Sequence, residues 1–285
     1  NVISQGLLSL DLASLLNNAQ GQLLATSALQ VLGNATLLNQ GGQLASQGTL
    51  QLAGRRLDNT AQGTLAANGA VAVTLADSLA NDQDGLISSR DASVSLQAAS
   101  LTNQGGAVQA GQALDVRLQQ VLDNQRGKLI AQQGPLSLSA SSVDNRGGVL
   151  ASLHGLLQAQ VAGLLRNDQG GTLQASQLNL VALGGLNNQS GRLAAQAGPL
   201  VIRTQQLDNR NGGLYGQGQV TLEATALDNS AGGKLAGQAL DLTLSGALYN
   251  RAGIIESDSR LGLVAAAFDN QGGQLRSLGG AQSRL

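Results

Sequence analysis

One short sequence pattern recurs from end to end of the chain, and its period constrains the fold more than any other feature. An apolar residue stands two positions before an asparagine, and a glycine, a leucine and a small residue follow, as in the stretch from Leu122 to Ala131. The asparagine recurs every 20–22 residues, at Asn18, Asn39, Asn59, Asn81, Asn103, Asn124, Asn145, Asn167, Asn188, Asn209, Asn229, Asn250 and Asn270. Such a period is the signature of a stacked repeat array, in which one repeat buries its apolar face only against its neighbours.

Within each repeat the apolar residues alternate with polar ones. Residues two apart share one face of an extended segment, so the asparagine should point inward together with the apolar residue two positions before it. A later segment also alternates with period two, as at Leu114, Val116 and Leu118, and no stretch sustains the three–four spacing of a helix. We therefore predict an all-β fold, a right-handed parallel β-helix (β-solenoid) of about 13 coils with 20–22 residues each.

The repeated asparagine and glycine are the candidate structural site. A buried amide without a partner costs about 1–3 kcal/mol, so we expect the asparagines to form a ladder along the axis or to bond to the turn backbone. A glycine stands three residues after the asparagine in eleven of the thirteen copies, and its fixed place predicts a turn that needs a positive φ. These turn glycines are Gly21, Gly42, Gly106, Gly127, Gly148, Gly170, Gly191, Gly212, Gly232, Gly253 and Gly273; in the other two copies Gly63 and Gly85 follow one residue later.

The composition favours one repeat domain over residues 1–285. Aromatic residues make up 1% of the chain, and Cys, Met and Trp are absent, so Leu, Val, Ile and Ala must fill the core. The segment from Val2 to Gly6 already matches the segment from Leu44 to Gly48 inside a repeat, so we expect the chain to be a fragment of a longer array. Such a fragment exposes strand edges at both ends, which favours end-to-end self-association.

Charge and hydropathy exclude several kinds of partner. The net charge is −1, from 16 basic and 17 acidic residues, so we expect no nucleic-acid binding. No apolar run approaches the roughly 20 residues that span a bilayer. The absence of Cys excludes disulfides and thiolate metal sites.

The sequence holds no convincing catalytic or ligand site. His154 is the single histidine and has no partner for a metal site or a triad. An aspartate precedes the asparagine in several copies, but it is absent from others, and we expect it to face solvent rather than to bind calcium. We therefore predict no catalytic residue, no cofactor, no metal and no small-molecule substrate. A polysaccharide-degrading β-helix enzyme would need inserted loops and clustered carboxylates, for which coils of uniform length leave no room.

The repeat resembles a known family. The segments Leu57–Asn59, Leu122–Asn124, Leu207–Asn209 and Leu227–Asn229, together with the Gly-Gly-x-Leu segment of several repeats, are similar to the haemagglutinin repeats of filamentous-haemagglutinin-type exoproteins. These exoproteins belong to Gram-negative two-partner secretion systems and include adhesins and contact-dependent growth inhibition effectors. The resemblance covers essentially the whole chain. It implies export through an outer-membrane partner transporter, localisation at the outer cell surface or in the medium, and a role as the shaft that extends a binding or toxin module.

A second interpretation stays open beside the shaft. The segment could itself hold a site for a receptor or glycan on a target cell, and the outward residues that depart from the repeat are the candidates for it. They are Tyr215, Tyr249, Arg251 and Arg260.

Overall fold

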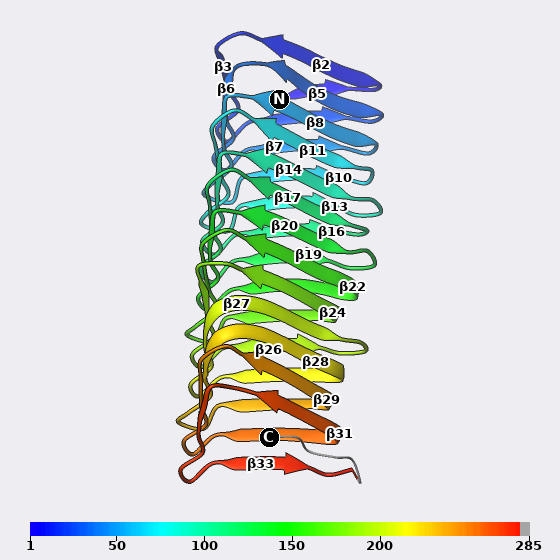
Figure 1. The fold of residues 1–285 in the computed structure, drawn as a ribbon. Coiled ribbons are helices and arrows are strands. Elements are labelled where there is room, and N and C mark those ends of the chain that lie inside the picture. Colours follow the sequence, from blue (N-terminus) through cyan, green and yellow to red (C-terminus); the bar gives the residue numbers. More distant parts are fainter. Residues whose placement is uncertain (280–285) are drawn as a thin grey trace. The chain divides into compact units, whose positions relative to one another are not determined.

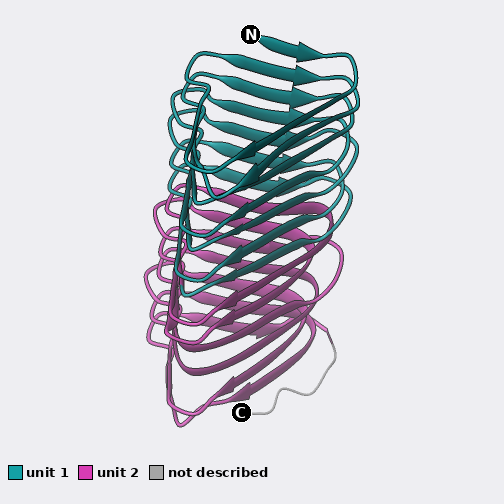
Figure 2. Ribbon diagram, turned by 90° about the horizontal axis from the view of Figure 1, so that it is seen from above, with its two compact units in different colours: residues 1–141 teal, residues 142–285 magenta. Residues whose placement is uncertain are grey.

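The computed structural model describes residues 1–279, and these residues form only strands, turns and bends. The chain is divided into two compact units, residues 1–141 and 142–285 (Figure 2). In each unit the strands pair in parallel with their equivalents one coil away, so the prediction of an all-β, parallel β-solenoid is confirmed. The assignment of residues 1–285 to a single domain stays a prediction.

Unit 1 is built from three rows of strands, and each coil adds one strand to each row (Figure 1). The post-turn row follows the asparagine turn and contains β1 (Val2–Ser4), β4 (Gln22–Ala25), β7 (Gln43–Ser46), β10 (Thr64–Ala67), β13 (Leu86–Ser89), β16 (Ala107–Ala110) and β19 (Lys128–Ala131). The middle row contains β2 (Leu7–Leu12), β5 (Ala28–Gly33), β8 (Thr49–Gly54), β11 (Val71–Leu75), β14 (Val94–Ala98), β17 (Leu114–Leu118) and β20 (Leu136–Ala140). The pre-turn row leads into the asparagine and contains β3 (Leu15–Asn17), β6 (Thr36–Leu38), β9 (Arg56–Asp58), β12 (Ser78–Ala80), β15 (Ser100–Thr102) and β18 (Val121–Asp123).

Unit 2 follows the same plan, but many of its strands run on through the corners between rows. Single-row strands are β21 (Ser142–Asp144), β23 (Leu164–Arg166), β25 (Gly185–Asn187), β30 (Ala247–Tyr249) and β32 (Ala267–Asp269) before the turn, and β26 (Arg192–Ala195) and β33 (Gln274–Ser277) after it. The post-turn and middle rows are joined in β22 (Val149–Val161), β24 (Thr172–Ala182), β29 (Lys234–Leu244) and β31 (Ile254–Val264). The middle and pre-turn rows are joined in β27 (Leu200–Asp208), and β28 (Gly213–Asp228) passes through all three.

Equivalent residues of successive coils stack on one another. Leu65, for example, lies in register with Leu44 on one side and with Ile87 on the other, and all three are fully buried. Each buried leucine contributes about 1.5–3 kcal/mol, and its neighbours along the column are again aliphatic. The core of each unit is therefore a set of aliphatic columns, as the period-two pattern predicted.

The two prolines of the chain stand at the starts of middle-row strands. Pro135 and Pro199 come directly before β20 and β27, where a strand does not yet need a ladder N–H. Their carbonyl groups accept hydrogen bonds from Leu114 and Leu178 on the preceding coils at 2.9 and 3.0 Å.

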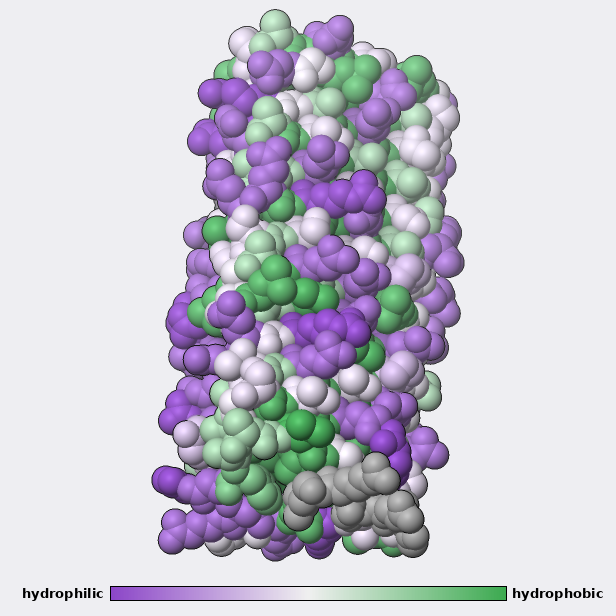
Figure 3. All heavy atoms as spheres, viewed as in Figure 1, coloured by the Kyte–Doolittle hydropathy of each residue, from purple (hydrophilic) through white to green (hydrophobic). Residues whose placement is uncertain are grey.

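Outward-facing residues are mixed in character. On the face shown in Figure 3, hydrophilic and hydrophobic side chains alternate in small clusters. Exposed large apolar side chains include Leu15 and Val121 in unit 1 and Leu183 and Val264 in unit 2. Residues 1–279 contain no helical segment that could serve as a membrane span.

Candidate functional site

The asparagines are joined by side-chain hydrogen bonds inside each unit. In unit 1 each Nδ2 donates to the Oδ1 of the asparagine on the next coil, from Asn18 through to Asn124, and every donor–acceptor distance is 2.7 Å. In unit 2 the same bonds run from Asn145 to Asn270 at 2.7–2.8 Å. Most of these side chains have no exposed surface and cannot bond to water. The ladder provides the hydrogen-bond partners that such buried amides require.

The same amide groups also fix the turn. Each asparagine Nδ2 donates to the carbonyl of a glycine in its own turn, at 2.9–3.4 Å. We call these thirteen residues the packed glycines: Gly21, Gly42, Gly63, Gly85, Gly106, Gly127, Gly148, Gly171, Gly191, Gly212, Gly233, Gly253 and Gly273. Every copy therefore has its glycine, because the four turns with one extra residue carry it one position later.

The reason for these glycines differs from the prediction. Most of the predicted turn glycines do not have a positive φ; only Gly170 and Gly232 do, and in their coils the packed glycines are Gly171 and Gly233. The positive φ belongs to the residue before the packed glycine, which is often not a glycine, as at Gln20, Arg126 and Ser190. The prediction of a positive φ at the glycine is thus wrong for nine of the eleven positions.

Close packing between coils explains the packed glycines instead. A Cβ atom on Gly127 would lie 2.0 Å from the backbone oxygen of Asn103 on the preceding coil and 2.6 Å from Oδ1 of Asn124. Equivalent contacts of 1.8–2.1 Å with the preceding coil recur at Gly42, Gly106, Gly191 and Gly253. Any side chain at this position would force the coils apart, so the glycine allows the ladder to keep its short spacing.

The aspartates that directly precede ladder asparagines in the sequence form hydrogen bonds with the turn backbone. The Oδ1 atoms of Asp58, Asp123, Asp144, Asp208, Asp228 and Asp269 each accept a hydrogen bond from the backbone N–H two residues later, at 3.0–3.2 Å. This is an Asx-turn, in which a short polar side chain replaces a backbone partner. The arrangement gives these carboxylates a structural role, and residues 1–279 hold no group of three or more potential metal-ligating His, Cys, Asp or Glu side chains.

Arginine neighbours lower the pKa of three of these carboxyl groups, Asp144, Asp208 and Asp269. Partial burial of the Asp144 carboxyl raises its pKa, but hydrogen bonds from the side chain and backbone of Arg146 and the charges of Arg146 and Arg166 outweigh this, and the pKa is lowered. The pKa of Asp208 is also lowered, because hydrogen bonds from Arg210 and Gln189 outweigh the effect of burial. A carboxyl group with a lowered pKa in the folded state stabilises the fold above its unfolded pKa of about 4, and that stabilisation is lost as the pH falls through the folded pKa.

We expect the double variant Asp144→Asn/Asp208→Asn to lose less stability on acidification than the parent chain. Its free energy of unfolding should be lower at pH 7, and the two curves should converge as the pH falls below about 4. Urea unfolding followed by circular dichroism across this pH range measures the effect. The control is Asp77→Asn, because Asp77 is exposed and forms no ion pair within residues 1–279. Parallel curves for the parent and the double variant would contradict the prediction.

The other candidates from the sequence do not assemble into one site. His154 is exposed on β22, in the segment where the register with β24 shifts. Tyr249 lies in the pre-turn row, in register with Asp228 and Asp269, whereas Tyr215 lies in the post-turn row, in register with Ala194 and Ala236. Arg251 pairs with Asp269, and Arg260 pairs with Asp241.

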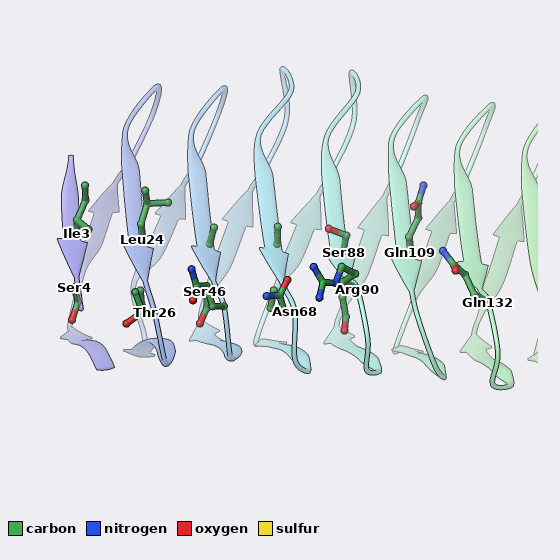
Figure 4. A pocket seen from close by; sticks show the side chains of 16 residues that line it. Ile3, Ser4, Leu24, Thr26, Ser46, Asn68, Ser88, Arg90, Gln109 and Gln132 are labelled. Carbon is green, nitrogen blue, oxygen red and sulfur yellow. The ribbon is translucent and has the colours of Figure 1, made fainter. Parts of the chain in front are cut away.

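Unit 1 has a shallow trough of about 730 Å³ along the post-turn row. Figure 4 shows its labelled side chains on successive strands, with Ile3 and Leu24 at one end and Gln109 and Gln132 at the other. Small residues such as Ala45 and Ala66 line it between these ends. Its one arginine, Arg90, already pairs with Asp91 at 3.0 Å, so the trough offers no unpaired charge that would select a ligand.

Sequence reasoning singled out Tyr215 but missed Arg192 and Lys234, which lie beside it. Two hollows of about 660 and 280 Å³ in unit 2 share Arg192 and Tyr215, and Lys234 lines the smaller one. Arg192 and Lys234 each stand four or five residues after a ladder asparagine, and aligning the coils on the packed glycine places them in one outward column.

A solenoid in which every coil repeats one ladder position is a repeat scaffold. The haemagglutinin repeat model matches residues 3–56, 34–95, 66–125, 91–154, 152–211, 189–252 and 240–283, so the chain belongs to the haemagglutinin repeat family. Haemagglutinin repeats folded in this way fit a structural segment of a large extracellular or surface exoprotein. Comparisons with curated proteins and with solved structures found no significant match.

Proposed function

We propose that this segment is the structural shaft of a large secreted or cell-surface exoprotein, an adhesin or a contact-dependent growth inhibition effector, and extends its binding or toxin module from the bacterial surface. The observation that carries the proposal is the hydrogen-bonded asparagine ladder, which runs through every coil within each unit. A side chain that bonds to its equivalents above and below propagates one geometry from coil to coil. Such a ladder favours a long and regular array of coils, and this structural role needs no catalytic group.

Export through a two-partner transporter in the outer membrane of a Gram-negative bacterium is part of the same proposal. A chain without Cys can cross an envelope unfolded without forming disulfides on the way. Each coil contacts its neighbours through local pairings, so the chain can wind coil by coil as it emerges. The receptor of the exoprotein lies on the target cell and is bound by the extended module.

Deletion of one whole coil tests the shaft role. Removing residues 60–81 from the exoprotein joins Asn59 to Asp82 and preserves the spacing between the ladder asparagine and the packed glycine Gly85. Because the coils on either side are equivalent, we expect the shortened protein to fold, to reach the surface and to retain the binding or delivery activity of its module. Limited proteolysis, surface labelling and the activity assay measure these three properties.

A half-coil deletion is the matched control. Removing residues 60–70 breaks the register of every row, and we expect loss of protease resistance and of surface display. A protein without residues 60–81 that folds and is displayed but has lost its activity would show that these coils carry a function of their own, against the shaft proposal.

A further inference from the structure

Two cations flank one glycine on the outward face of the post-turn row in unit 2. Arg192 on β26, Gly213 on β28 and Lys234 on β29 lie in register on adjacent strands. Adjacent strands are about 4.8 Å apart, so the Cα atoms of Arg192 and Lys234 are about 10 Å apart with Gly213 between them. The hollow of about 280 Å³ at this point is lined by both cations, Asn211, Tyr215 and four glycines, and by no carboxylate.

The tyrosine ring fills the gap above Gly213 and holds the arginine. A Cβ atom on Gly213 would lie 2.3 Å from Cε2 of Tyr215, so the ring rests where a side chain would otherwise stand. The guanidinium carbon of Arg192 lies 4.7 Å from the centroid of the ring. A guanidinium stacked on an aromatic ring is restrained in position, while the N–H groups at its edge remain able to donate.

These two cations differ from the other basic side chains around them. Arg146, Arg166, Arg203, Arg210, Arg251, Arg260 and Arg276 each form an ion pair with an aspartate or glutamate. Between residues 142 and 279, Arg192 and Lys234 are the Arg and Lys side chains that have no carboxylate within ion-pair distance. Both are exposed and line the same hollow, so the site carries two positive charges that the unit itself does not neutralise.

Two unpaired cations favour an anionic ligand, and the neighbouring hollow indicates which chemical groups the rest of that ligand carries. It shares Arg192 and Tyr215 with the first, has a volume of about 660 Å³, and is also lined by Gln196, Gln217, Asp258 and Glu256, the last of which pairs with Arg276. Amide and carboxylate groups of this kind exchange hydrogen bonds with hydroxyl groups. An extended peptide fits less well, because β26, β28 and β29 are paired on both sides and offer no strand edge.

We propose that the Arg192–Tyr215–Lys234 cluster is a binding site for a carboxylated sugar. The sugar's carboxylate lies between Arg192 and Lys234, where the guanidinium edge donates to it, and its hydroxyl groups face Gln196, Gln217 and Asp258. Gly213 is a positioning residue, because it gives the Tyr215 ring its place under Arg192. The site adds recognition of one class of ligand to a segment whose proposed role is structural.

The sparse aromatic composition gives a direct test. The chain contains two Tyr, one Phe, one His and no Trp, so the Tyr249→Phe variant leaves Tyr215 as the single tyrosine reporter in proton NMR spectra. Sodium glucuronate is titrated into this variant at constant ionic strength, with glucose, acetate and inorganic phosphate in parallel titrations. We expect the Tyr215 ring signals to shift saturably with glucuronate in the millimolar range, and to shift much less with the other three.

Variants of the cluster separate its parts. Arg192→Gln and Lys234→Gln should each weaken glucuronate binding by about tenfold or more, since each removes a charge-assisted hydrogen bond. Gly213→Ala should weaken it without a change in net charge, because the new methyl group displaces the ring. Lys128→Gln is the matched control, because Lys128 occupies the equivalent outward place on β19 of unit 1 and should leave binding unchanged. Circular dichroism verifies that each variant is folded.

Three outcomes would overturn the proposal. They are no Tyr215 shift with glucuronate, equal shifts with acetate or phosphate, which would reduce the site to a general anion site, and unaltered binding in Lys234→Gln. The coil deletion in unit 1 leaves all these residues in place, so failure here and failure of the shaft role can be told apart.

Discussion

Replacement of Gly106 by alanine is expected to destabilise the protein by about 3 kcal/mol or more. The new Cβ atom would lie 1.8 Å from the backbone oxygen of Asn81 and 2.6 Å from Oδ1 of Asn103. Neither atom can move away without a large cost in free energy, because the first belongs to the backbone of the preceding coil and the second accepts a ladder hydrogen bond at 2.7 Å. Guanidinium unfolding followed by circular dichroism measures the loss.

The neighbouring glycine provides the control for this prediction. Gly105 has a φ of +68°, and no atom lies within 4 Å of the place where its Cβ would stand. Arg126 and Ser190 hold the equivalent place in other turns, with φ values of 56° and 55°. Gly105→Asn should therefore change the stability by less than about 1 kcal/mol, since asparagine tolerates the left-handed region. Equal losses for Gly105→Asn and Gly106→Ala would contradict the distinction between turn conformation and coil packing.

Truncation of one ladder residue is the second large effect. Asn81 accepts a hydrogen bond from Asn59 and donates one to Asn103, both at 2.7 Å, and all three side chains are fully buried. Asn81→Ala leaves the amide of Asn59 without one acceptor and Oδ1 of Asn103 without its donor. At about 1–3 kcal/mol for each buried group that loses a partner, we expect a loss of about 2–6 kcal/mol.

An exposed asparagine is the comparison for the ladder variant. Asn34 lies at the surface between β5 and β6, and Asn34→Ala should change the stability by no more than about 0.5 kcal/mol. Asn81→Asp keeps the size of the side chain but replaces the donor by a second acceptor opposite Oδ1 of Asn103, so it should be at least as damaging as alanine at pH 7. Equal unfolding midpoints for Asn81→Ala and Asn34→Ala would show that the ladder contributes little to stability.

The sequence alone predicted the parallel solenoid and the inward direction of the asparagine. Both depend on spacing along the chain: a period near 21 residues sets the coil, and a separation of two residues places Leu122 and Asn124 on one face. The aspartate beside them was also expected outside the core. Its hydrogen bond with the backbone N–H two residues later is local, but it could not be predicted from the spacing, because it depends on the backbone conformation of the turn.

Only the tertiary structure shows why the packed glycine is needed and where two cations without a carboxylate partner lie together. The atoms that exclude a side chain from Gly127 belong partly to Asn103, which lies on another coil, and no spacing in the sequence gives that distance. Likewise Arg192, Tyr215 and Lys234 lie on three successive coils, and their meeting depends on the exact length of each turn, which varies by one residue. A short-range pattern fixes what each coil looks like, whereas contacts between coils are set by the register in which they stack.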